Sequence, residues 1–222
     1  DSSLNLYKGP SATTKGFIAF NLESTVLKDV RVRRAMVHAL DRDLITETVG
    51  GEVASRACGF LAPGAYWGAL SCDELPSYPY DPQKAKKLLA EAGYPKGFTI
   101  RYPEINVKAH KDIAPVLQAY WKEVGIEAKI ELLPVKEWLG RGHKGNFDVT
   151  KYSMGTRPSE PSLFLHSNFH STSTRPGLNF MAYKDVDDLL EMALATTDVK
   201  KRRELYAKIQ YKVIDESIII PI

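Results

Sequence analysis

Two histidines, His166 and His170, have the spacing that most directly suggests chemistry. Residues four apart lie on one face of a helix, so these two rings could bind a zinc ion together. However, the polar residues from Ser167 to Thr174 favour a loop, no glutamate of the H-E-x-x-H kind is present, and no third ligand is evident. We therefore expect no metal site. His38, His110 and His143 are expected to be surface or capping residues.

Catalytic motifs give no support for an enzyme. The sequence has no G-x-S-x-G, no cysteine with a histidine partner and no Ser-x-x-Lys in a strand-to-helix setting. It also lacks G-x-G-x-x-G and G-x-x-x-x-G-K-[ST], the loops that hold nucleotide phosphates. We predict a protein without catalytic activity or cofactor, with a small α/β hydrolase as an alternative.

Cys58 and Cys72 lie 14 positions apart in a segment rich in glycine, proline and tyrosine. A disulfide that closes a loop of this size contributes about 3 kcal/mol to stability in the chain-entropy model. The alternative is two unrelated buried thiols. Neither cysteine has another Cys or His at zinc-ligand spacing, so a zinc knot is not expected.

Composition excludes several classes of protein. The 222 residues are 44% hydrophobic, which is enough for a buried core, and the formal charge of +3 is too small for a nucleic-acid-binding surface. No apolar run reaches the length of about 18 residues that a membrane span needs. Asp1 to Pro10 is polar, so no signal peptide is expected.

The hydrophobic periodicity and the capping residues of the sequence predict the helices and strands that could position a site. The first half of the chain predicts a buried strand at Phe17–Leu22, helices at Arg31–Leu40 and Asp41–Val49, a long structured loop at Glu52–Tyr80, and a capped helix that begins after Asp81 and ends at Gly93. We expect the arginines of the first helix to face outward or to form pairs.

The second half predicts a β-α-β unit formed by Phe98–Tyr102, Asp112–Val124 and Ile126–Leu133, which implies a parallel pair of strands in an α/β protein. After it we expect a short helix at Val135–Leu139, a strand at Phe147–Met154, a helical turn at Glu160–Phe164, helices at Val186–Ala195 and from Thr197 or Asp198 to Ile214, and a final strand at Ser217–Ile222.

Two stretches of the chain carry a family resemblance. The first has Phe20 and Asn21 at the end of a strand, then Asp29, Arg31, Val32, Arg33, Ala35, Ala39, Asp41 and Arg42. The second runs D-P-Q-K-A-K-K-L-L-A-E-A-G-Y from Asp81 to Tyr94. Both resemble the C-terminal lobe of bacterial extracellular solute-binding proteins of the oligopeptide, dipeptide and nickel class.

That resemblance implies one lobe of a type II periplasmic-binding-protein (venus-flytrap) fold, with a mixed sheet flanked by helices and residues 1–222 as a single domain. It implies a solute captured outside the cytoplasmic membrane, in the periplasm or at the cell surface, and delivered to the permease subunits of an ABC importer. The first lobe of the same protein would be a missing partner, in a chain of about twice this length. An exported family also favours the Cys58–Cys72 disulfide. A nickel or metal-chelate receptor of the same family is an alternative.

The segment from Asp148 to Leu165 resembles the family's cleft segment, in which peptide binders commonly carry W-x-x-D-x-x-D-P. Arg157 stands where the first aspartate would pair with a ligand amine. A guanidinium there favours an anionic small molecule over a peptide amine. The alternative is that Arg157 pairs with Glu160. The ligand-binding residues predicted with Arg157 are Tyr152, Met154, Gly155, Thr156, Asn179, Phe169 and Trp67. Asn179 could instead orient its loop, and Trp67 could be a core residue.

Overall fold

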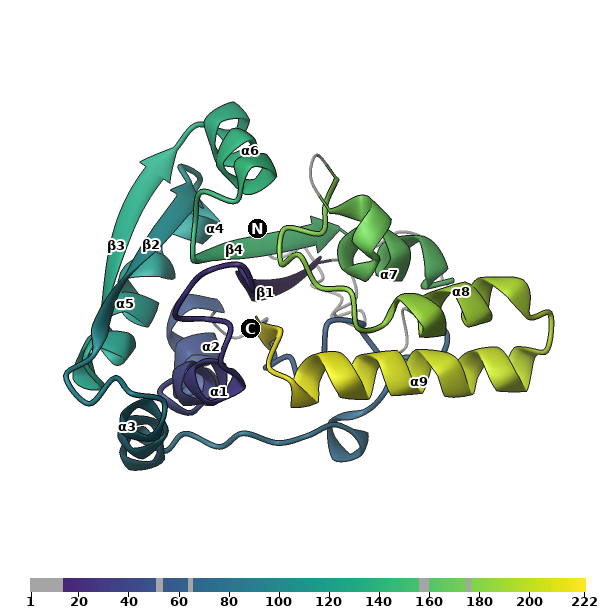
Figure 1. Ribbon diagram of the computed structural model, residues 1–222, viewed down its shortest axis with the longest axis horizontal. Helices are drawn as coiled ribbons and strands as arrows, with labels where there is room; N and C mark the ends of the chain where they lie inside the picture. Colours follow the sequence, from purple (N-terminus) through teal and green to yellow (C-terminus); the bar gives the residue numbers. More distant parts are fainter. Residues whose placement is uncertain (1–13, 51–53, 64–65, 156–159, 175–176) are drawn as a thin grey trace, which may run out of the picture.

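The computed structural model describes residues 14–50, 54–63, 66–155, 160–174 and 177–222. Helices lie on both sides of its central antiparallel strands, and a parallel pair of strands lies at the left of the view (Figure 1). The strands are β1 (Thr14–Phe20), β2 (Phe98–Ile105), β3 (Ile126–Leu133), β4 (Val149–Gly155) and β5 (Ile219–Pro221). The α/β class predicted from the sequence is confirmed.

The strands form two hydrogen-bonded ladders that meet between β2 and β4. One ladder is antiparallel in the order β4-β1-β5, and the other is the predicted parallel pair β2-β3. The Asp148 N–H donates to the carbonyl of Arg101 at 3.0 Å, so β4 continues the sheet beside β2 in the same direction. Because β1 alone runs the opposite way, β2, β3, β4 and β5 all end at one edge, which we call the carboxyl edge.

The helices lie on both sides of these strands, with α1, α2, α3 and α5 on one side and α7, α8 and α9 on the other (Figure 1). They are α1 (Val30–His38), α2 (Arg42–Gly50), α3 (Pro82–Glu91), α4 (Lys108–Lys111), α5 (Ala114–Glu123), α6 (Val135–Lys144), α7 (Ser162–Phe169), α8 (Asp187–Ala195) and α9 (Val199–Asp215), with 3-10 turns η2 (Cys72–Glu74) and η3 (Ser171–Ser173).

Strand β1 separates two hydrophobic clusters. Its alternate residues point to opposite faces, as strand geometry requires. Phe17 and Ala19 join an aromatic-rich cluster with α6 to α9 and the segment around the disulfide, which we call the aromatic face. Ile18 and Phe20 join a cluster with α1, α2, α3, α5 and the parallel strands, which we call the helical face. All four side chains are buried, so one strand serves both clusters.

One prediction about the helices needs correction, and one short helix was not predicted. The helix expected at Asp112–Val124 is present as α5, with Pro115 in its first turn, and the helix that was missed is α4 before it. The turn expected at Glu160–Phe164 is the longer helix α7, which includes Ser167 and Asn168. Both polar side chains hydrogen-bond to the carbonyl four residues earlier, at 2.6 Å and 2.8 Å, and this arrangement lets them stay in a helix.

Asn21 and Arg33, which belong to the first stretch of family resemblance, stabilise the fold through hydrogen bonds to backbone carbonyls. The Asn21 amide donates to the carbonyls of Gly145 and Phe147, and the buried Arg33 guanidinium donates to carbonyls at Leu27, Lys28, Glu216 and Ser217. The prediction that the arginines face outward or pair is therefore wrong for Arg33, because backbone carbonyls take the place of a carboxylate. His38, expected at the surface, is buried and its Nδ1 lies 2.7 Å from the Pro79 carbonyl.

Candidate functional site

The carboxyl edge holds a cavity of about 470 Å³. In open α/β sheets this edge is where ligands usually bind. The start of β1 and the residue after β5 also line it, since the Ile222 N–H donates to the Gly16 carbonyl at 3.0 Å. The remaining lining comes mainly from α2, from the segment after it (Ala54, Ser55 and Ala57), and from α4 and the residues beside it, with Ile45, Val49, Val107 and Ile113 as apolar walls.

Two polar side chains of this cavity, His110 and Lys151, stand against a fully buried carboxylate. Glu104 Oε1 lies 2.5 Å from His110 Nδ1 and accepts the N–H of Ile105 at 2.8 Å, while Oε2 accepts the backbone N–H of Lys151 at 3.3 Å. A carboxylate only accepts hydrogen bonds, so the imidazole carries a proton on Nδ1. The prediction that His110 is a surface or capping residue is wrong.

Lys151 is only 8% exposed although it carries an ammonium group. Loss of hydration lowers its pKa, and the negative charge of Glu104 acts in the opposite direction. The same carboxylate adds to the burial that raises the pKa of Tyr102 well above its ordinary value. His110 and Lys151 therefore line one wall of the cavity and form a buried polar cluster with Glu104 behind them.

The predicted ligand-binding residues of β4 divide between core and edge. Tyr152 is buried on the aromatic face, stacks on Phe17 with ring centroids 5.5 Å apart, and has its pKa raised to about 12 by burial. Met154 and Gly155 are the last residues of β4 and pair with Lys15 and Thr14 of β1, which places them at the carboxyl edge. Thr156 and Arg157 lie outside the described residues.

Phe169 and Asn179 are fully buried behind the edge. The Phe169 ring packs against Phe60 with centroids 4.8 Å apart. The Asn179 amide donates to the carbonyls of His170 and Tyr183, and its oxygen accepts the Tyr183 N–H. Neither residue lines the cavity. The hydrogen bonds of Asn179 fit the loop-orienting role considered from the sequence.

Trp67 is half-buried and packs edge-on against Tyr206 of α9, with ring centroids 6.0 Å apart. The Tyr206 hydroxyl in turn donates to Glu160 Oε1. The other carboxylate oxygen of Glu160 accepts the Ser162 N–H at 2.9 Å, so both oxygens have partners on described residues. An additional pairing of Glu160 with Arg157 involves a residue outside the described chain.

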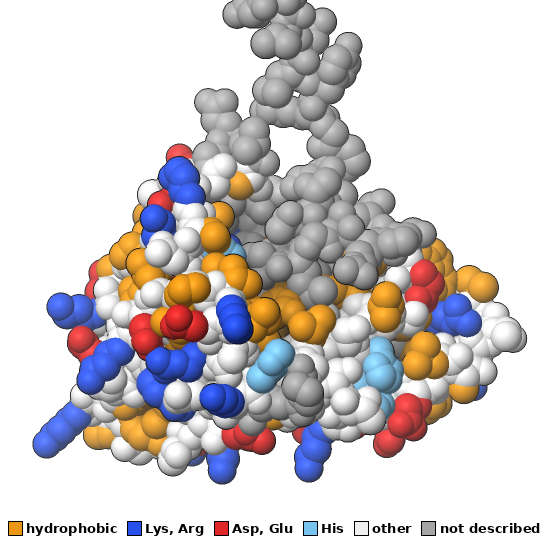
Figure 2. Space-filling model, turned by 90° about the horizontal axis from the view of Figure 1, so that it is seen from above, with side chains coloured by type: hydrophobic (Ala, Val, Ile, Leu, Met, Phe, Trp, Pro, Cys, Tyr) orange, Lys and Arg blue, Asp and Glu red, His pale blue; other side chains and the backbone are white. Residues whose placement is uncertain are grey.

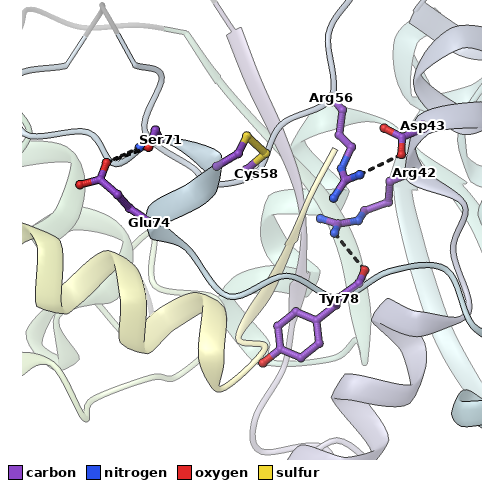
Figure 3. Close-up of a disulfide and its surroundings, with 8 residues drawn as sticks. Arg42, Asp43, Arg56, Cys58, Ser71, Glu74 and Tyr78 are labelled. Carbon is purple, nitrogen blue, oxygen red and sulfur yellow. Dashed lines mark hydrogen bonds and ion pairs between the residues drawn. A yellow bond between two sulfur atoms is a disulfide. The ribbon is translucent and has the colours of Figure 1, made fainter.

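The predicted disulfide between Cys58 and Cys72 is present, with Cα atoms 5.2 Å apart (Figure 3). It fixes the segment that brings Trp67 to α9, and Gln210 of α9 holds the same segment through the Leu70 N–H and the Gly68 carbonyl. Beside the disulfide, Arg56 pairs with Asp43 at 2.8 Å. The long loop is therefore ordered by side chains from distant elements.

His166 and His170 stack with ring centroids 4.2 Å apart. His170 Nδ1 accepts the Thr172 N–H, which leaves the proton on Nε2, 3.4 Å from a carboxylate oxygen of Glu191. Burial and the second ring lower the pKa of His166. Within the part of the chain that the structure describes, no three His, Cys, Asp or Glu side chains are grouped to hold a metal ion, and no helix has the length and apolar character to cross a membrane.

The surface near the edge is uneven in character. Figure 2 shows hydrophobic side chains gathered in the middle of the face seen from above, and Lys and Arg side chains concentrated toward its left side. Sequence reasoning missed Glu104 and Lys151. The predicted strand ended at Tyr102, before Glu104, and a lysine inside an apolar strand is no signal by itself because long side chains often reach solvent.

Comparisons with known proteins show which proteins the chain is similar to. A family model described as bacterial extracellular solute-binding proteins, family 5 middle, matches residues 1–176. The chain is 33% identical over 226 residues to the dipeptide-binding protein of Escherichia coli, an alignment that covers 98% of this chain and 41% of that protein.

Solved structures give the same result. HbpA2 from Haemophilus parasuis superposes with a TM-score of 0.87 at 30% identity, over 95% of this chain and 42% of that one. DppA from Helicobacter pylori in complex with the peptide STSA superposes with a TM-score of 0.87 at 26% identity, over 95% and 41%. The chain thus spans about two fifths of the length of these relatives.

Proposed function

Because the chain belongs to the bacterial extracellular solute-binding proteins of family 5, we propose that it forms one lobe of a receptor that captures a small solute for an ABC importer. The observation that carries this proposal is the family match together with a cavity lined by residues that follow β2 and β5. The alignments to peptide-binding relatives favour this function over a hydrolase or a nickel receptor.

The proposed receptor has two lobes, of which residues 1–222 form one domain. The pairing of β1 with β5 supports this arrangement, because it brings the first and last described strands side by side at the carboxyl edge. A second lobe facing this edge would close over the ligand. The ligand shifts the equilibrium between the open and the closed receptor only by the difference between its affinities for the two forms, and no covalent step is required.

The proposed ligand is peptide-like or an anionic small molecule, and the proposed setting is the periplasm or the outer face of the cytoplasmic membrane, with permease subunits as partners. Met154, Gly155, Thr156 and Arg157 would face the ligand from the end of β4, with Trp67 beside them. Tyr152, Phe169 and Asn179 would hold that surface in place from the core.

Calorimetry on the intact protein with a library of di- and tripeptides and of small carboxylates tests the function. We expect at least one class to bind and to raise the melting temperature, since a ligand that binds only the folded state stabilises it. Arg157→Ala should weaken anionic ligands by about tenfold or more. Arg203→Ala, which removes an exposed arginine of α9, is the matched control and should have no effect. Failure of every ligand class to bind would reject the receptor function.

A further inference from the structure

We propose that the guanidinium groups of Arg42 and Arg56, beside the disulfide, form a binding site for a phosphate group. Arg42 is the first residue of α2, whereas Val49 and Gly50 at the end of that helix line the carboxyl-edge cavity. The length of α2 therefore separates the two sites. The inference goes beyond the proposed function and does not depend on it.

The first observation is the contrast between two buried arginines. Arg33 and Arg42 are only 5% and 6% exposed. The Arg33 guanidinium donates to four backbone carbonyls. Among the described residues, the Arg42 guanidinium donates only to the Tyr78 carbonyl, from Nη2 at 3.2 Å. Because buried donors are normally hydrogen-bonded, the Nε and Nη1 groups of Arg42 need a further acceptor.

The second observation is another guanidinium beside the first. Arg56 lies in the segment that the disulfide holds, and Figure 3 shows its guanidinium next to that of Arg42. Arg56 Nη1 pairs with Asp43 at 2.8 Å, but its Nε is buried and has no partner among the described residues. Burial lowers the pKa of Arg42 to about 10, the charge of Arg56 adds to this effect, and Asp43 opposes it. The two cations therefore repel each other, and an anion between them would remove the repulsion.

The third observation is the space next to these groups. Two cavities of about 280 Å³ and 120 Å³ share three lining residues, Arg42, Arg56 and Ser77. All three carry hydrogen-bond donors, two of them with a positive charge. A small anion that enters either cavity thus meets the same set of donors.

Carboxylates near the site are already used or exposed. Asp41 and Asp43 line the smaller cavity and Asp73 lines the larger one. Asp41 caps α2, since its Oδ1 accepts the Leu44 N–H at 3.0 Å, and Asp73 is exposed. Asp43 holds one nitrogen of Arg56, but its side chain is 73% exposed, so water screens its charge. An incoming anion therefore competes mainly with Asp43.

The arrangement of the donors favours phosphate over carboxylate. A carboxylate has two oxygens, and one guanidinium binds both in parallel. Here N–H groups of two guanidiniums face the same space, and a phosphate group has enough oxygens to accept from both at once. The site therefore fits the anion with more acceptors and more charge.

The test titrates inorganic phosphate into the intact protein at constant ionic strength, with chloride as the compensating anion. Calorimetry measures the affinity, and NMR follows the side-chain Nε–H signals of Arg42 and Arg56. We expect saturable binding that shifts both signals, and about tenfold weaker binding of acetate, which accepts fewer charged hydrogen bonds. Glycerol phosphate is the third probe. Tighter binding of this probe than of inorganic phosphate assigns the site to a phosphate ester, and the reverse order assigns it to the free ion.

Two substitutions should change the affinity in opposite directions. Arg56→Gln removes one guanidinium and should weaken phosphate binding about tenfold or more. Asp43→Asn removes the competing carboxylate and should strengthen it about threefold. Arg141→Gln is the matched control: Arg141 pairs with Glu131 at the same 2.8 Å, its side chain is 33% exposed against 31% for Arg56, and it lines neither cavity. It should leave the affinity unchanged.

Absence of saturable phosphate binding in the wild-type protein overturns the inference, as does acetate that binds as tightly as phosphate or an affinity that survives in Arg56→Gln. Equal weakening in Arg141→Gln also overturns it, because that result would show only a general attraction of anions to a basic protein. Thermal unfolding without phosphate checks that each variant is folded. If Arg56→Gln is not, Asp43→Asn and the wild-type NMR signals decide. The receptor function is judged separately, by the peptide and carboxylate library.

Discussion

The helical face and the aromatic face of the sheet are stabilised in different ways. On the helical face, α1 and α3 carry their own caps: Asp29 accepts the Arg31 N–H and Asp81 accepts the Lys84 N–H, both at 2.8 Å. On the aromatic face, the segment around the disulfide and α7 depend on rings and side chains from distant parts of the chain. One face is therefore specified locally and the other by long-range contacts.

Tryptophan substitutions give the largest expected effects and test whether the two faces unfold together. Trp121 is fully buried on the helical face, and its indole N–H donates to the Met36 carbonyl at 3.1 Å. Trp138 lies on the aromatic face and donates to the Thr150 hydroxyl at 2.7 Å. We expect each change to alanine to cost about 3–5 kcal/mol in the free energy of unfolding, measured in urea.

Because β1 belongs to both clusters, each tryptophan variant should shift a single cooperative transition. A second transition in Trp138→Ala, with the helical face still folded, would contradict this expectation and show two separate units. Trp121→Phe is the milder control, since it keeps most of the buried ring and loses the hydrogen bond.

The disulfide gives the next largest effect and should act on the aromatic face. Replacement of Cys58 and Cys72 by serine should lower the free energy of unfolding by about 3 kcal/mol, because the unfolded chain regains the conformational entropy that the disulfide removes from it. Hydrogen exchange should accelerate around Trp67 and Gln210 more than in α1 or α3. A reductant should destabilise the wild-type protein and leave the double variant unchanged. Equal acceleration on both faces would contradict the assignment.

The same division explains what the sequence could predict. The helix that begins after Asp81 has an N-cap aspartate, a proline in its first turn and a glycine after its end, so local rules suffice, and the structure confirms it as α3. The N-cap residue of α7, Pro161, has no side-chain cap hydrogen bond, and the helix gains stability from buried Phe164 and Phe169, which no local pattern reveals.

The candidate site shows this limit most clearly. The end of β4 was predicted from a motif, and Met154 and Gly155 lie at the carboxyl edge. The cluster of Glu104, His110 and Lys151 arises only when β4 lies beside β2, a contact between residues 47 positions apart. The sequence by itself gives no sign of that pairing, so a buried lysine looks like a surface one.

Asp148 connects the two ladders and gives a smaller effect with a defined pH dependence. It accepts the Arg101 backbone N–H at 2.7 Å, the Arg101 guanidinium at 3.0 Å and the Ser24 hydroxyl at 2.6 Å. Burial raises its pKa, but these hydrogen bonds outweigh burial and bring the pKa below its ordinary 3.8. Asp148→Asn should lower the free energy of unfolding by about 1.5 kcal/mol at pH 7. This value is near the lower end of the contributions of hydrogen bonds to charged groups, because Arg101 is half-exposed.

The sign of the pH effect follows from the lowered pKa. The contribution of the Asp148 carboxylate is complete above the pKa of the unfolded chain and disappears as the pH falls through the lower pKa of the folded protein. The difference between wild type and Asp148→Asn should therefore shrink below about pH 4. Asp73→Asn, at an exposed position in η2, is the control and should differ from wild type by less than about 0.5 kcal/mol. A constant difference down to pH 2 would contradict the argument.

The cap of α3 gives the smallest effect and tests the local character of the helical face. Asp81→Ala removes the acceptor for the Lys84 N–H and should cost about 1 kcal/mol in urea unfolding. Asp81→Asn keeps a side-chain oxygen at the same place and should cost only a few tenths of that amount. Since the cap acts within one helical turn, the loss should not alter hydrogen exchange in α7 or α9. Faster hydrogen exchange on the aromatic face in Asp81→Ala, or an Asp81→Asn variant as unstable as Asp81→Ala, would mean that Asp81 acts through contacts beyond its own helix.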